Sequence, residues 1–194
     1  MANLFATLGY EAFRAGIKPR SEESRNWFRK KVQGMRSINR ASLMKDESLI
    51  QTESDLVGSM NMFFYDPKTK DTLPYYDKFP LAIIVGPAEN GFYGLNLHYL
   101  PMTLRAKFLD ALLENLTNKQ YDEKTRFRLT YNLLQRSSKL KYFKPCFKHY
   151  LTSNVKGRFS RVPASEWEIA TFLPTASWSK ASGDSVYKDS RRMI

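Results

Sequence analysis

Cysteine is almost absent from this chain, because Cys146 is the only one among 194 residues. One thiol cannot form an internal disulfide, so a disulfide-stapled secreted fold is excluded and the composition fits a reducing compartment. Histidine is nearly as scarce, with His98 and His149 in different segments and no zinc-ligand spacing around them. The chain also has no glycine-rich phosphate loop. We therefore expect neither a metal site nor a cofactor.

Long apolar runs are also missing. No stretch approaches the roughly 20 apolar residues that a membrane-spanning helix needs. The first residues, MANLFATLGYEAFRAGIKPR, lack the positive segment ahead of an apolar core that marks a secretory signal. We therefore expect no membrane partner, and a soluble protein that stays inside a cell or is packaged in a particle made there.

The most informative absence is of acidic residues. Residues 124–158 contain ten Lys or Arg and six Tyr or Phe, but no Asp or Glu. Exposed surfaces normally mix both signs, because like charges on neighbouring turns repel each other. The chain as a whole is divided as well: residues 1–45 carry net +7, residues 46–123 net −6 and residues 124–194 net +11. This distribution is typical of a protein that binds a polyanion.

The N-terminal part of the chain reads as helical. Ser21 can cap a helix that follows Pro19, and the apolar residues Phe28, Val32 and Met35 recur at helical spacing along it. Basic residues occupy much of the remaining surface of that helix. We predict a basic helical arm and linker over residues 1–57, in which residues 37–57 are weakly packed and form a mobile arm.

The following segment is rich in aromatic and β-branched residues and in turn signals. Strands are predicted near 59–65, 80–86 and 91–99, with the last two joined as a hairpin. An apolar helix is expected after Pro101, another after Asp122 and a helical piece through Leu151. FSRV suggests a strand, and Ser165 to Glu168 fits a capping box that opens a short helix. The tail from Ser177 is expected to be extended.

These elements predict an α+β fold, with a small antiparallel β-sheet or barrel packed on helices and a basic helical N-terminal arm. A single core domain is expected over residues 58–176, followed by a polar basic tail over residues 177–194.

The basic residues are the candidate contacts to nucleic-acid phosphates, since Lys and Arg neutralise the backbone and release counterions. The first choice comprises Lys139, Lys141, Lys144, Lys148, Lys156 and Arg158. Behind them stand Arg126, Arg128 and Arg136, and the candidate arm contact is Arg29, Lys30 and Lys31. The arm helix could instead dock on an acidic protein, and a membrane surface is the weakest alternative because its apolar stripe is narrow. Four rings could stack on exposed bases or belong to the core instead: Tyr142, Phe143, Phe147 and Tyr150.

Signals for catalysis are weak. Asp66, Asp71 and Asp77 lie near predicted strand ends, but they have no metal-site spacing and are ordinary turn residues. His98 is expected to be a hydrogen-bonded strand residue. Cys146 would have a lowered pKa only if exposed among its basic neighbours, and burial is the commoner fate of such a residue. We expect a protein that is not an enzyme.

Several blocks together resemble a known family: MFFYDPKTKDTLPYYDKFPL, GFYGLNLHYLP, KYFKPCFKHYL, EWEIATFLP and DSRRMI. They are similar to the DNA end protectors of T-even-like contractile-tailed bacteriophages, over about residues 23–194. The resemblance implies a virion protein that sits on the termini of a packaged genome and is present in the host cytoplasm during infection. It assigns no role to any single residue.

Two functions of different class fit these observations. The first is non-enzymatic binding of linear double-stranded DNA, with protection of its ends. The second is a structural protein of the baseplate, neck or tail, whose basic segments dock on acidic virion proteins. Phosphate binding predicts a continuous stripe of Lys and Arg, whereas docking predicts basic groups mixed with an apolar patch. A third possibility is a nuclease that uses Asp66 or Asp77.

Overall fold

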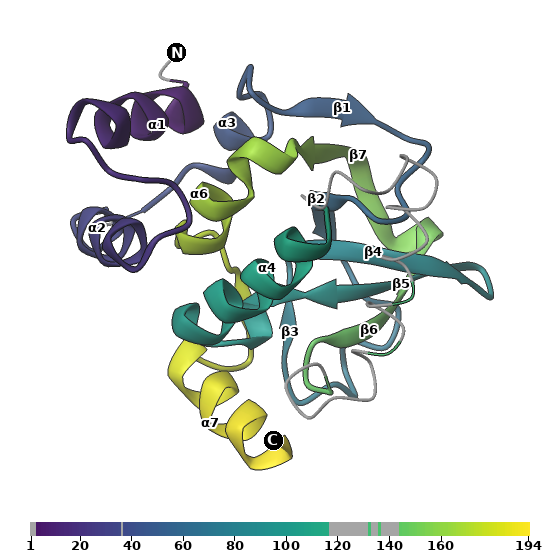
Figure 1. Cartoon of the computed structure of the whole chain (residues 1–194). Helices are drawn as coiled ribbons and strands as arrows, with labels where there is room; N and C mark the ends of the chain where they lie inside the picture. Colours follow the sequence, from purple (N-terminus) through teal and green to yellow (C-terminus); the bar gives the residue numbers. More distant parts are fainter. Residues whose placement is uncertain (1–2, 36, 117–131, 133–135, 137–143) are drawn as a thin grey trace.

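The computed structural model describes residues 3–35, 37–116, 132, 136 and 144–194 (Figure 1). The helices in this part of the chain are α1 (Leu4–Arg14), α2 (Glu22–Gln33), α3 (Arg40–Leu43), α4 (Met102–Leu116), α6 (Trp167–Phe172) and α7 (Gly183–Met193). The strands are β1 (Ile50–Thr52), β2 (Met60–Tyr65), β3 (Tyr76–Asp77), β4 (Leu81–Ala88), β5 (Gly91–Asn96), β6 (Phe147–Leu151), β7 (Val155–Val162) and β8 (Trp178–Ser179). Short 3-10 turns are η1 (Leu97–Tyr99), η3 (Thr152–Asn154) and η4 (Ala164–Glu166).

Six strands form an antiparallel sheet in the order β1-β7-β2-β4-β5-β6, and β3 pairs with β8 in a small second sheet. The predicted hairpin is confirmed: β4 and β5 are joined by Glu89 and Asn90, and Asn90 adopts a positive φ of 56°. Asn tolerates this left-handed conformation better than most residues, so it suits a two-residue hairpin loop. The FSRV strand is confirmed as the end of β7.

One face of the sheet packs on the helices. Alternate residues of the central strands, such as Met62, Ile83 and Leu95, are at most 1% exposed and share a cluster with Phe108 of α4 and Ile169 of α6. Figure 1 shows α4 and α6 crossing this face, with α1 and α2 beyond them. Burial of this apolar area is the main stabilising contribution to the fold. The predicted apolar helix after Pro101 is confirmed as α4.

The opposite side chains of the same strands form a second, aromatic cluster. Its buried members are Phe63, Tyr65, Ala82, Ile84, Phe92, Tyr150 and Phe159. Phe63 lies at its centre, with ring centroids 4.9 to 6.3 Å from four other rings. A Cβ on Gly91 would lie 1.8 Å from the carbonyl oxygen of Tyr150, so only glycine permits β5 and β6 to approach this closely.

The two N-terminal helices pack into the helical cluster. Phe5 and Leu8 of α1, and Phe28 and Val32 of α2, are at most 4% exposed. The expectation of weak packing over residues 37–57 is wrong, because Leu43 and Leu49 join the same cluster and β1 pairs with β7. The function of residues 1–57 as a basic arm, and the division of the chain at residues 57 and 176, stay predictions.

Ser21 caps α2 as predicted, since its Oγ accepts a hydrogen bond from the Ser24 amide at 3.0 Å. We expect Ser21→Ala to lower the free energy of unfolding by about 1 kcal/mol, because the amide at the helix start loses its acceptor. Urea denaturation measures this change. The matched control Ser37→Ala alters an exposed residue between α2 and α3 and should stay within about 0.5 kcal/mol of the parent. Equal values for the two variants would contradict the capping role.

The helical piece predicted through Leu151 is wrong. Residues Phe147–Leu151 form β6, which pairs with β5 from Gly91↔Leu151 to Leu95↔Phe147. The spacing of Phe147 and Tyr150 fits a helix, but the backbone groups of β5 offer a complete ladder of hydrogen bonds on that side. Alternation then separates Tyr150, which enters the aromatic cluster, from Phe147, which packs partly against the helical one.

Three smaller expectations also need correction. The strand predicted at 91–99 ends at Asn96, whose side chain accepts from the His98 amide and starts the turn η1. The short helix before Pro174 exists as α6, but no side chain caps its start, and Ser165 lies within the turn η4. The tail is not extended: α7 begins after Ser182, whose Oγ accepts from the Ser185 amide.

Taken together, the described residues form an open antiparallel sheet packed on helices, which confirms the predicted α+β class and its sheet alternative.

Candidate nucleic-acid interface

The predicted phosphate contacts fall into three groups in space. Lys144 precedes β6 and Lys148 lies within it, Lys156 and Arg158 lie on β7, and Arg29, Lys30 and Lys31 lie on α2. Arg136 is exposed. Lys139, Lys141, Arg126 and Arg128, and the rings Tyr142 and Phe143, lie outside the described residues. The helix predicted after Asp122 also falls largely outside them.

The first group, at β6, has the most one-sided charge. Lys144 is exposed and has no ion pair among the described residues. Lys148 is partly buried, with its Nζ 4.0 Å from the centre of the Tyr99 ring and no carboxylate within salt-bridge distance in the described chain. Burial lowers the pKa of Lys148. An anion beside this group would favour its charged form.

The second group, on β7, has acidic neighbours. Between Met62↔Ser160 and Phe64↔Lys156 the strand β7 contains two extra residues, and Gly157 takes a φ of 81° in this bulge. Lys156 and Arg158 line one hollow of about 620 Å³, together with Asp46 and Glu47. Arg158 also pairs with Glu53 at 3.0 Å, although both side chains are 70% exposed. Such exposed pairs contribute little, so Arg158 remains able to exchange its partner.

The third group, on α2, is distant from the other two. In Figure 1 α2 lies at the opposite side of the molecule from β6 and β7. Lys31 is held by Glu11 at 2.6 Å and lies over the Trp27 ring, whereas Arg29 and Lys30 are exposed. Any contact of DNA with α2 is therefore separate from a contact with β6.

One exposed ring, Tyr93, lies on the strand that pairs with β6. Tyr93 of β5 is 37% exposed and its ring stacks on Phe147 at 5.1 Å and approaches His149 at 5.4 Å. Tyr150, predicted as a possible stacking ring, is instead 4% exposed within the aromatic cluster. Sequence reasoning did not single out Tyr93, although the alternation of apolar residues along 91–96 would have placed it on the face opposite Phe92.

Asp77 is the hub of a buried hydrogen-bond network. Its Oδ1 accepts from the amides of Phe79 (3.0 Å) and Ser177 (2.9 Å), and its Oδ2 accepts from Asn96 Nδ2 (3.1 Å) and His98 Nδ1 (2.6 Å). Since a carboxylate only accepts, His98 carries its proton on Nδ1, and Nε2 accepts from the Thr175 hydroxyl at 3.1 Å. The expectation of a hydrogen-bonded His98 is thus confirmed, in a 3-10 turn instead of a strand.

In this network Asp77 is charged and His98 is neutral. Burial raises the pKa of Asp77, but His98 and the two amides outweigh it and leave the pKa lowered, so the carboxylate is charged. Burial lowers the pKa of His98, which is therefore neutral. The balancing cation is Arg105, 2% exposed, which donates to the carbonyls of Leu100 and His98 and to the Tyr187 hydroxyl. Every oxygen of Asp77 is occupied by a donor from the protein.

Little in the described residues favours the nuclease alternative. They contain no group of three or more His, Cys, Asp or Glu that could hold a metal ion. Asp66 pairs with Lys70 at 3.0 Å, and Asp77 is engaged as a structural residue. Cys146 is fully buried, and burial raises the pKa of its thiol to about 12. The condition for a reactive thiolate is therefore not met.

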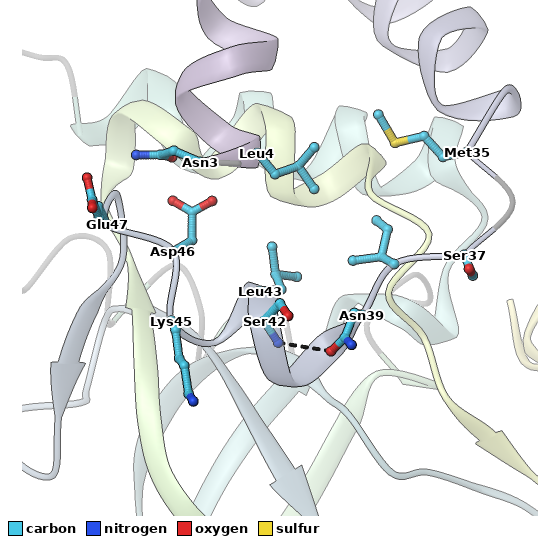
Figure 2. A pocket seen from close by; sticks show the side chains of 11 residues that line it. Asn3, Leu4, Met35, Ser37, Asn39, Ser42, Leu43, Lys45, Asp46 and Glu47 are labelled. Atoms are coloured by element: carbon cyan, nitrogen blue, oxygen red, sulfur yellow. Dashed lines mark hydrogen bonds between the residues drawn. The ribbon is translucent and has the colours of Figure 1, made fainter. Parts of the chain in front are cut away.

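A separate hollow of about 500 Å³ lies between the start of α1, α3 and the segment before α3 (Figure 2). Leu4 and Leu43 face it, and the Asp46 carboxylate lies beside them near Glu47. Lys45 is the single cation among its described lining residues, and in Figure 2 its amino group points away from the hollow. Two carboxylates against one lysine repel phosphate, so this hollow is no candidate for a DNA contact.

Among the described helices, none has the length and apolar character needed to cross a membrane. In a comparison with protein families, the model of the phage T4 terminal DNA protecting protein matches residues 11–190. Searches of curated proteins and of solved structures found no significant match. The family name describes protection of DNA, which is not a class of enzymes, and it lends no support to the structural virion alternative. The match spans most of the chain and confirms the resemblance seen in the sequence, and the protein therefore belongs to the family of the phage T4 terminal DNA protecting protein.

Proposed function

We propose that this protein binds linear double-stranded DNA without cleaving it and covers the ends of a phage genome, in the virion and in the host cytoplasm during infection. The family match over residues 11–190 carries the proposal. The net charge of +12, with 124–158 free of acidic residues, supplies the attraction to phosphate.

The β6 region is the proposed centre of the contact. Lys144 and Lys148 lie there, and on the face of β6 opposite Lys148 the exposed ring of Tyr93 stacks on the partly buried Phe147. A duplex end offers two features that continuous DNA hides: a terminal base pair with one open face, and strand termini. Rings can cover the first, because every base has a π-face, while the lysines neutralise adjacent phosphates. The β7 and α2 cations would then contact DNA further from the end.

The test compares a short linear duplex with a covalently closed circle of the same length and sequence. We expect at least tenfold tighter binding to the linear form, and protection of that form from an added exonuclease. Incubation with magnesium or manganese but no exonuclease should leave both DNAs intact. Equal affinity for linear and circular DNA would remove the preference for ends, and cleavage by the protein alone would contradict the non-enzymatic function.

A further inference from the structure

A pocket of about 290 Å³ lies between β6 and residues 65–76, and we call it the tyrosine pocket. Its lining includes Tyr65, Tyr99, Tyr150, Lys68 and Lys148. We propose that the tyrosine pocket receives the phosphate-bearing terminal nucleotide of a DNA strand, with Lys148 Nζ on the phosphate. This inference rests on the proposed function and names the feature that would distinguish an end from continuous DNA.

The walls of the pocket are aromatic and already in place. Tyr99 packs edge-on against Trp178 at 4.8 Å, and Tyr65 packs edge-on against Tyr150 at 4.9 Å. The Tyr65 hydroxyl accepts from the Leu151 amide at 3.1 Å, which fixes that ring to β6. Mainly aromatic walls with a few placed polar groups are the usual composition of a small-ligand site.

The loop of residues 66–73 lines the pocket, and hydrogen bonds from residues outside the loop hold it in place. Lys180 Nζ donates to the carbonyls of Lys70, Asp71 and Leu73 at 2.6 to 3.1 Å. Asn154 Nδ2 donates to the carbonyl of Asp66 at 2.7 Å. These bonds hold the loop without any ligand, so a ligand does not have to order it. Preorganisation of this kind favours binding.

Lys148 gives the pocket its charge preference. Its Nζ lies over the Tyr99 ring and has no hydrogen bond or ion pair with any described residue, although the side chain is partly buried. The acidic residue at the pocket is Asp77, but donors from the protein occupy both of its oxygens and Arg105 balances it. Lys68 adds a second cation at the lining. An anion is therefore the ligand that this pocket lacks.

The size of the pocket selects the kind of anion. A duplex, whose major groove alone is about 12 Å wide, cannot enter. One nucleotide can, provided that it leaves the stack. Leaving the stack costs least where pairing and stacking are already weakest, and a terminal nucleotide has only one stacked neighbour. Continuous DNA has no such nucleotide, so a pocket of this size distinguishes a DNA end from continuous DNA.

The test uses Lys148→Met, which removes the charge and keeps the length of the side chain. Loss of a partly buried cation should leave the melting temperature unchanged or raised. We expect affinity for a linear duplex with 5′-phosphates to fall about tenfold or more, and affinity for the closed circle to change less than twofold. Lys148→Arg should retain most of the linear affinity. The matched control Lys144→Met should weaken linear and circular binding equally.

A competition arm separates two sources of phosphate. A deoxynucleoside 5′-monophosphate should displace the linear duplex from the parent protein but not from Lys148→Met, whereas inorganic phosphate at equal ionic strength should do so in neither. Equal competition by inorganic phosphate would overturn the assignment to a nucleotide. If Lys148→Met keeps the full preference for linear DNA, the pocket inference is overturned and end binding stands. If the parent protein shows no such preference, the proposed end binding itself fails.

Discussion

DNA binding is expected to weaken about a thousandfold when the salt concentration rises from about 50 mM to about 200 mM. Each phosphate neutralised by Lys or Arg releases counterions, and about six contacts give a logarithmic slope near −5 against salt. The candidate cations of β6, β7 and α2 are sufficient for that number. Fluorescence anisotropy with a labelled linear duplex, titrated at several salt concentrations, gives the slope directly.

Single substitutions then show which residues contribute to the slope. We expect Lys144→Gln to reduce its magnitude by about one, because one released counterion is lost. The matched control is Lys188→Gln, which removes the same charge from an exposed position on α7. It should leave the slope unchanged. A slope near zero for the parent protein, with micromolar or weaker affinity at the lowest salt, would contradict DNA binding. It would favour the alternative in which the basic segments dock on acidic proteins.

Asp77→Ala is expected to lower the free energy of unfolding by about 3–5 kcal/mol. Removal of one partner from a buried charge network leaves the others uncompensated. Here four donors lose their acceptor, among them the Asn96 and His98 side chains, and Arg105 loses its balancing charge. Urea denaturation measures the change. Asp71→Ala, at an exposed position of the neighbouring loop, should stay within about 0.5 kcal/mol of the parent.

The same network makes stability depend on pH. The pKa of His98 is lowered in the folded state, so the unfolded chain binds more protons and stability falls as the pH drops below about 6.5. The pKa of Asp77 is also lowered, so its contribution is present above about 3.9 and is lost as the pH falls further. Denaturation of Asp77→Ala should lack this second loss. A variant as stable as the parent at neutral pH would show that Asp77 is not the hub of the network.

The sequence was most informative where the signals are local. The strands β2, β4 and β5 follow from apolar alternation and turn residues within short windows, and the cap at Ser21 follows from adjacent residues. The prediction from the sequence was wrong at Phe147–Leu151, because the spacing of Phe147 and Tyr150 fits a helix as well as a strand. The partner that decided the outcome, β5, lies far away in the sequence.

The candidate site likewise has features that local sequence predicts and features that depend on the fold. The one-sided charge of residues 124–158 and the family blocks are properties of the sequence itself, and they were sufficient for the prediction of a DNA-binding family member. Lys148 was already among the candidates as one cation of many. Its place over the Tyr99 ring, and the braced loop beside it, depend on contacts between distant segments.

Composition and short-range patterns are therefore enough to predict the excess positive charge and the small antiparallel sheet. Which cations lie together follows from the fold. The fold separated α2 from β6, placed Lys156 and Arg158 at a hollow with Asp46 and Glu47, and left Lys148 without a carboxylate within salt-bridge distance among the described residues. Electrostatic pairing depends on distance in space, and the pairing of strands and packing of helices set that distance, whereas order along the chain does not.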